Sequence, residues 1–385
     1  MKKIIIAFLF VFVPLAVFAE LGEFTFGGEV KTGFISEKTE KYGMDPVTKV
    51  RLGSLNDDAG GDQGRIRLNF TYANGNTGIK GRLQWDNWQS DFQAPVWPYL
   101  FGYINSFDDQ LTISMGKLGA SPWGTGGPEK WKELESVDSG KGGGGVRTEY
   151  KPHYVPGLNI GFVLNWYDGS YDRGINKEVT LIDILRESVL GISYQNDYFL
   201  VRFAYRLDSD VDQRPGSFAS GREGDDLIYR VEEHVIQNYL PGFQIWALGI
   251  YEGVFAEFKD CIRYINWMFV QYAPELFTAQ VRLGYDVVAA RSIVHIKPSY
   301  YHNFFDKLIS VGASFYYAQD FGADKINTNA PYTEIQFEPM LRLNLTNAYV
   351  VFAYNLTQKT KQPQADSKFP IDRTQTMNLR FGMSF

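Results

Sequence analysis

The sequence predicts an all-β protein, a transmembrane antiparallel up-and-down β-barrel, and three observations lead to it. Apolar and polar residues alternate along many short segments, as in strands with two different faces. Aromatic residues make up 16% of the chain, yet its mean hydropathy is slightly negative. Short turns alternate with longer polar loops. No apolar stretch after the first residues approaches the ~18 that a membrane helix needs, so a chain of this composition could span a membrane only as a closed barrel without unpaired edges.

The first residues have the pattern of a secretory signal peptide. Lys2 and Lys3 precede an apolar run over residues 4–18, and Val17 and Ala19 occupy the expected cleavage positions. We expect cleavage after Ala19, which leaves residues 20–385 as a single barrel domain. No Cys follows the cleavage site, so the mature amino-terminus has no residue to carry a lipid anchor.

Charge and cysteine content exclude several classes of protein. The chain has 38 Lys and Arg against 44 Asp and Glu, and without Lys2 and Lys3 the balance is 36 − 44 = −8. No basic tail or acidic block indicates a nucleic-acid partner. The single cysteine, Cys261, excludes an internal disulfide framework.

The alternating segments number 18, from Phe24–Phe34 to Thr374–Phe385, with 16 strands as the alternative. Turns rich in Asn, Asp, Gly and Pro connect half of them, for example "YANGNTG" at 72–78 and "NSFDDQ" at 105–110. Longer polar loops fall between these turns, at 35–63, 119–145, 168–188, 208–226 and 357–373. Short turns therefore lie at one end of the sheet and long loops at the other, which is typical of outer-membrane barrels.

The strands also indicate which face meets water. In "GRIRLNFTY" the apolar residues Ile66, Leu68 and Phe70 alternate with Arg65 and Arg67. The next strand repeats the pattern, with Lys80 and Arg82 on its polar face. Long charged side chains this regular fit a wet barrel interior and an apolar face toward lipid. The strand at 261–272 is the exception, being apolar on both faces; packing against a loop and a subunit contact both remain open.

The last strand carries the most specific pattern in the chain. Met377, Leu379, Phe381, Met383 and Phe385 alternate with polar or small residues, and the chain ends on Phe. In this feature, and in its signal peptide and loop asymmetry, the chain resembles the outer-membrane porins of diderm bacteria, which have 16 or 18 strands. The resemblance implies location in the outer-membrane lipid, a C-terminal signal read by the barrel-assembly machinery, and a homotrimer as in much of the family.

The third long loop, 119–145, invites a second comparison. In porins this loop folds into the lumen and its carboxylates face a basic cluster on the wall. Here the resemblance implies that Glu129, Glu133, Glu135 and Asp138 face a wall formed by Arg65, Arg67, Lys80 and Arg82, although the family's short acidic signature is not clear. The alternative is an ordinary extracellular loop with solvated charges.

The expected function is a water-filled channel for passive diffusion of small hydrophilic solutes. Basic residues outnumber acidic ones among the charges assigned to the lumen, which predicts a weak anion preference. The basic set is Lys31, Arg65, Arg67, Lys80, Arg82, Arg202, Arg206, Arg282, Lys297, Arg342 and Arg380, and the acidic set is Glu29, Asp86, Asp286, Glu334 and Glu338.

Other functions remain as alternatives. Long outer loops would suit a non-conducting surface barrel such as an adhesin, and a sugar-selective channel would use aromatic residues such as Trp88, Trp97, Trp123 and Trp131. A soluble exported β-sandwich is a further alternative. The sequence has four His, no Gly-x-Ser-x-Gly elbow and no zinc-ligand spacing, so we expect no enzyme activity, no catalytic or metal-binding residues, and no cofactor.

Overall fold

The computed structural model describes residues 22–52, 64–86, 95–118, 122–123, 144–165, 188–210, 223–252, 263–274, 277–286, 291–321, 333–361 and 370–385. The predicted signal segment, 1–19, lies outside these ranges, as do Glu129, Glu133, Glu135 and Asp138.

The described residues form 19 β-strands and one short helix. The strands of the first half are β1 (Glu23–Glu40), β2 (Val47–Leu52), β3 (Arg65–Asn74), β4 (Thr77–Asp86), β5 (Val96–Ser106), β6 (Leu111–Lys117), β7 (Gly144–Tyr150), β8 (Leu158–Asn165), β9 (Val189–Gln195) and β10 (Phe199–Asp210). The second half contains β11 (Glu223–Glu233), α3 (Val235–Tyr239), β12 (Phe243–Glu252), β13 (Arg263–Tyr272), β14 (Phe277–Asp286), β15 (Arg291–Phe304), β16 (Ile309–Asp320), β17 (Thr333–Asn344), β18 (Ala348–Thr360) and β19 (Ile371–Ser384).

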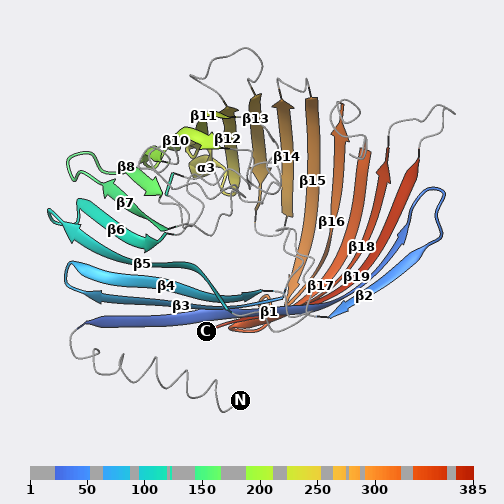
Figure 1. The fold of residues 1–385 in the computed structure, drawn as a ribbon. Coiled ribbons are helices and arrows are strands. Elements are labelled where there is room, and N and C mark those ends of the chain that lie inside the picture. The colour runs from blue at the N-terminus through green and yellow to red at the C-terminus, as the bar shows by residue number, and fades with distance from the viewer. Residues whose placement is uncertain are drawn as a thin grey trace, which may run out of the picture.

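The sheet closes on itself, because the last strand pairs with the first. Neighbouring strands pair antiparallel around the barrel, and β19 pairs with β1 from Glu29↔Ser384 to Glu40↔Arg373. Figure 1 shows the resulting arrangement, with β19 beside β1 and the strands following one another in chain order. The predicted closed antiparallel barrel is confirmed.

The 19 strands occupy 18 positions in this barrel. β3 pairs with the first half of β1, from Glu23↔Ala73 to Lys31↔Arg65, whereas β2 pairs with its second half, from Phe34↔Leu52 to Thr39↔Val47. β2 and β3 are therefore two segments of one strand position, and the predicted count of 18 is confirmed.

Two local expectations differ from the structure. The sequence predicts that the first strand ends at Phe34 and that a loop follows over 35–63, but β1 continues to Glu40 and turns back as β2. The segment "SEKTE" is polar on both faces and "VTKV" places one Val on each face, so neither shows the apolar–polar alternation of a strand. Their backbone groups nevertheless pair as a hairpin extension. The turn between β11 and β12 also contains the helix α3, the only helix among the described residues, and it is too short to cross a membrane.

The turns at two places show the same backbone device. Phe107, Asp108 and Asp109 all have positive φ, and so do Phe305, Asp306 and Lys307. In both turns the residue three positions after Phe donates its N–H to the Phe carbonyl. Three consecutive left-handed non-glycine residues reverse the chain within a few residues, as the short-turn end of the barrel requires.

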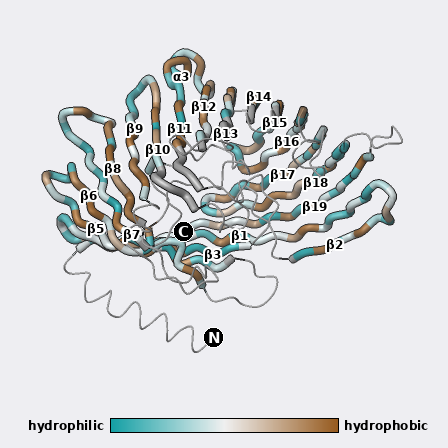
Figure 2. Tube along the Cα trace, turned by 45° about the horizontal axis from the view of Figure 1, so that its top comes forward, coloured by the Kyte–Doolittle hydropathy of each residue, from teal (hydrophilic) through white to brown (hydrophobic). Residues whose placement is uncertain are grey.

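The two faces of the wall differ as the alternation predicts. Side chains at paired positions share a face and successive residues alternate. The outward positions of β19 are held by Met377, Leu379, Phe381 and Met383, which are exposed or half-buried, and Phe385 continues this face. Figure 2 shows the same alternation of hydrophilic and hydrophobic residues along β16 to β19. The outer face therefore presents apolar side chains, as lipid requires.

Candidate functional site: the inner wall of the barrel

Where β1 and β3 meet on the inner wall, the Glu29 carboxylate pairs with three basic side chains. The register places Glu29 opposite Arg67 and Lys31 opposite Arg65. Glu29 Oε1 lies 2.9 Å from Arg65 Nε and 3.0 Å from Arg67 Nη1, and its Oε2 lies 3.3 Å from Lys31 Nζ. Three cations thus share one anion, and this part of the wall carries excess positive charge.

The neighbouring strands extend this positive surface. Arg82 Nε donates to Asn69 Oδ1 at 2.7 Å, and its guanidinium lies over the Tyr99 ring at 5.1 Å. Lys80 Nζ lies 5.2 Å from the ring centroid of Tyr103. We call Lys31, Arg65, Arg67, Lys80 and Arg82 the basic patch. The four basic residues predicted for the lumen wall are thus together on one surface, because they alternate with outward apolar residues on adjacent strands.

Acidic and basic residues are more evenly balanced on β17 to β19. Glu338 accepts a hydrogen bond from Asn355 Nδ2 at 3.1 Å and lies 3.7 Å from Arg380 Nη2. Glu334 pairs with Lys359 at 3.1 Å. Together with β1, β3 and β4, these strands form what we call the charged wall.

The inner face of β8 to β15 is different in kind. Together with Leu118 and Trp123, its buried apolar side chains form what we call the apolar cluster, with the members Val163, Val189, Ala204, Ile228, Trp246, Leu248, Trp267, Phe269 and Ile293. The same face also carries Arg230 and the buried Glu232. The register places the strand members of the cluster on the same face as Glu29 and Arg67, which is the inside of the barrel. The strand that the sequence shows as apolar on both faces therefore contributes Trp267 and Phe269 to this inner cluster.

Trp123 reaches the inner wall from outside the strands. Its indole lies directly on Gly161 of β8 and Gly191 of β9, where a Cβ would come within 2.4 Å and 1.9 Å of ring atoms. Trp123 is fully buried. These two glycines pair with each other in register and leave the space that the ring occupies. Trp123 belongs to the loop 119–145, so this loop contacts the inside of the barrel at that residue.

The other tryptophans proposed as sugar contacts do not share this position. Trp97 lies edge-on to Phe70, at 6.1 Å between ring centroids, and Phe70 faces outward. Trp88 and Trp131 lie outside the described residues. The structure thus provides no aromatic rail at Trp97.

Two carboxylate-centred clusters were missed by the sequence analysis. Glu149 is buried and pairs with Arg147 at 2.9 Å and Lys151 at 3.1 Å. Glu232 is also buried and pairs with Arg230 at 2.5 Å. The i, i+2 spacing of opposite charges in "VRTEYK" and "YRVEEH" would have identified both, since it places the charges on one strand face.

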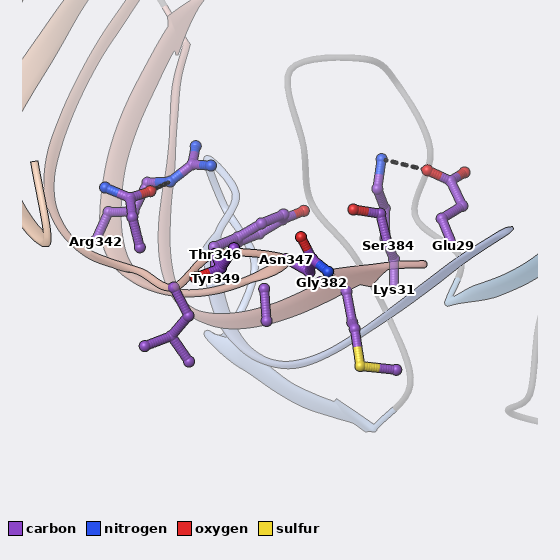
Figure 3. A pocket seen from close by; sticks show the side chains of 12 residues that line it. Glu29, Lys31, Arg342, Thr346, Asn347, Tyr349, Gly382 and Ser384 are labelled. Atoms are coloured by element: carbon purple, nitrogen blue, oxygen red, sulfur yellow. Dashed lines mark hydrogen bonds and ion pairs between the residues drawn. The ribbon is translucent and has the colours of Figure 1, made fainter. Parts of the chain in front are cut away.

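A cavity of about 320 Å³ opens on the inner wall at the short-turn end of the barrel. Its lining comes from β1, β17, β18, β19 and the turn at 345–347, and it includes Glu29, Lys31, Arg342 and Tyr349. Figure 3 shows Arg342 and Tyr349 on one side, the Glu29–Lys31 pair on the other, and Asn347 and Ser384 between them. The cavity adjoins the basic patch through Lys31.

The C-terminal residue completes the seam between β19 and β1. The Phe385 N–H donates to the Gly28 carbonyl, and the Gly28 N–H donates to the Phe385 oxygen at 2.8 Å. A Cβ at Gly28 would meet the Phe385 ring at 2.7 Å, so glycine is needed where the aromatic ring approaches the backbone. Within the described ranges no group of three His, Cys, Asp or Glu side chains is placed to hold a metal.

Comparisons with known proteins give similarity at the level of shape. No protein-family model matches the chain, and no curated protein matches its sequence. Among solved structures, a Rhodopseudomonas blastica porin with three substitutions is 12% identical with a TM-score of 0.47, and another triple mutant of that porin is 11% identical with a TM-score of 0.45. Each alignment covers 94% of this chain and 100% of the other.

Proposed function

We propose that this protein is an outer-membrane porin, a water-filled channel for passive diffusion of small hydrophilic solutes. The observation that carries the proposal is the closed barrel with an apolar outer face and a charged wall inside. Lipid favours the first surface and water the second. A channel of this kind performs no chemistry on its solutes.

Single-channel conductance of the refolded protein in planar bilayers tests this proposal. We expect stable current steps, and the heat-modifiable gel mobility of the sample verifies that the barrel is folded. A folded barrel without conductance would refute the porin proposal.

The second candidate is a non-conducting surface barrel, and the apolar cluster favours it. Buried apolar side chains inside a barrel require that other groups fill the space in front of them, which narrows any aqueous path. The same bilayer measurement separates the two candidates.

We further propose that the loop 119–145 enters the lumen and forms the constriction, with Glu129, Glu133, Glu135 and Asp138 opposite Arg65, Arg67, Lys80 and Arg82. Burial of Trp123 against Gly161 and Gly191 supports this, because it brings the start of the loop to the inner wall. Single-cysteine pairs between the loop and the basic patch, for example Glu133→Cys with Arg82→Cys, test it by disulfide formation. The natural Cys261 is replaced by Ser in these variants, and an outward Leu83→Cys partner serves as the control that should not cross-link.

The excess of cations in the basic patch supports a weak anion preference for the channel. Fixed positive charge raises the local concentration of anions at a narrow pore. The expected readout is a reversal potential of anion sign across a salt gradient.

Export and assembly complete the proposal. We infer cleavage after Ala19 by a signal peptidase, insertion into the outer-membrane lipid, and use of the alternating C-terminal residues and Phe385 by the barrel-assembly machinery. The mass of the mature protein tests the first point, and a Phe385→Ala variant, expected to lower the amount of folded barrel in the outer membrane, tests the last. A homotrimer stays a prediction, to be checked by the mass of the detergent-solubilised protein.

A further inference from the structure

The cavity at the short-turn end contains a cation with no acidic partner. Arg342 Nε donates to Asn344 Oδ1 at 2.6 Å, and its guanidinium stacks over the Tyr349 ring at 4.5 Å. In the described part of the chain no carboxylate pairs with it. These two contacts hold the guanidinium plane in place while leaving its Nη nitrogens available.

A second cation faces the same cavity from β1. Lys31 pairs with Glu29 at 3.3 Å, but Glu29 also holds Arg65 and Arg67. One carboxylate therefore offsets three positive charges, and the cavity is electropositive between Lys31 and Arg342. The terminal residue, Phe385, does not line the cavity.

Neutral polar groups occupy the space between the two cations. Thr346, Asn347 and Ser384 are exposed and line the cavity. Figure 3 shows Asn347 and Ser384 between Arg342 and Lys31. Hydroxyl and amide side chains both donate and accept hydrogen bonds, as the hydroxyl groups of a solute require.

We propose that this cavity is a binding subsite for a small hydroxylated organic oxyanion, with the carboxylate or phosphate group held by Arg342 and with Lys31 adding positive charge on the other side of the cavity. Arginine forms paired, charge-assisted hydrogen bonds with either group. Asn347 and Ser384 then contact the solute's hydroxyl groups. The inference rests on the proposed channel function and adds a site at its short-turn end, separate from a constriction at the loop 119–145.

The test combines equilibrium binding and channel block. Titration calorimetry with refolded, detergent-solubilised barrel measures binding of gluconate, glucose 6-phosphate and glucose. Planar-bilayer recordings then measure block of the current by the same compounds, added to one side at a time. We expect saturable binding of at least one anion, no binding of glucose, and block that is stronger from the short-turn side. Comparison of gluconate with glucose 6-phosphate decides between carboxylate and phosphate.

Variants make the site assignment specific. Arg342→Gln should weaken anion binding by about tenfold or more, the loss expected for a charge-assisted pair, and Arg342→Lys should restore part of it. Arg51→Gln is the matched control, because Arg51 pairs with Glu37 on the hairpin extension, remote from the cavity; its anion affinity should stay within about twofold of the parent.

Two results would overturn the inference. One is absence of saturable anion binding by a barrel whose folding is verified, and the other is equal affinity in the Arg342→Gln and parent proteins. A barrel that binds the anion but carries no current would refute the channel and leave the subsite standing. A conducting barrel without anion binding would refute the subsite and leave the channel standing.

Discussion

The charged wall and the apolar cluster face the same interior but differ in their exposure to water. The side chains of Glu29 and its three cations are each about one fifth exposed, for example 23% for Glu29 and 19% for Arg65, so water reaches them. Leu248 and Phe269 on the opposite wall are only 2% and 1% exposed. The inner face of this barrel is thus not uniform: the ion cluster around Glu29 stays within reach of water, whereas the apolar cluster is shielded from it.

The largest expected effect comes from placing a charge in the apolar cluster. Leu248→Asp would remove a buried apolar side chain and bury a carboxylate whose cross-strand neighbour, Arg230, already pairs with Glu232. We expect it to lower the free energy of unfolding by about 3–5 kcal/mol. The measurement is the urea midpoint of the barrel in lipid vesicles. Thr357→Asp, an inward position of the charged wall two residues from Lys359, is the control and should cost less than about 1 kcal/mol. Equal losses of unfolding free energy in the two variants would contradict the difference between the apolar cluster and the charged wall.

The contact of Trp123 should give the next largest effect. Gly191→Val places methyl groups where the indole lies, since even a Cβ would come within 1.9 Å of it. We expect a loss of about 1–3 kcal/mol in unfolding free energy, together with a change in single-channel conductance as Trp123 is displaced. The control is Gly102→Val on the outer face, where the nearest atom to a Cβ is 3.7 Å away. It should change neither the unfolding free energy nor the conductance by much. If folded Gly191→Val conducts like the parent protein, Trp123 does not shape the conducting path.

An apolar substitution on the charged wall should lower the free energy of unfolding only slightly. Asn355→Val removes the 3.1 Å hydrogen bond to Glu338 and the acceptor of the Thr357 hydroxyl. Water can replace both partners, so we expect a loss of only about 0.5–1 kcal/mol. The same urea titration measures it. A loss as large as that of Leu248→Asp would mean that Glu338 is shielded from water.

The smallest effect should be on selectivity. The triple change of Arg65, Arg67 and Arg82 to Gln removes three cations of the basic patch, and we expect the anion-to-cation permeability ratio to fall by roughly two- to threefold at 0.1 M salt, and by more at lower salt, where screening is weaker. The reversal potential across a salt gradient is the measurement. Lys38→Gln, an exposed position paired with Glu40 on the hairpin extension, is the control. Cation preference in the unmodified protein would contradict the predicted role of the patch.

Alternation and turn chemistry determined most of the fold from the sequence alone. A period of two assigns every residue of a strand such as β19 to one of two faces, so Met377 and Leu379 could be placed outward and Arg380 inward before any pairing was known. The same reasoning brought Arg65, Arg67, Lys80 and Arg82 together, because they lie on adjacent strands of one hairpin. Local patterns suffice when the interacting residues are neighbours in a regular hairpin.

Tertiary structure alone decided what fills the interior. Trp123 contacts Gly191, 68 positions further along the chain, and no local pattern predicts which glycine leaves space for which ring. The cavity likewise joins Lys31 of β1 to Arg342 of β17, which line one cavity only because β19 closes on β1. Strand periodicity specifies a side chain's face, whereas contacts across the barrel depend on closure, on register and on the chain segments that enter the lumen.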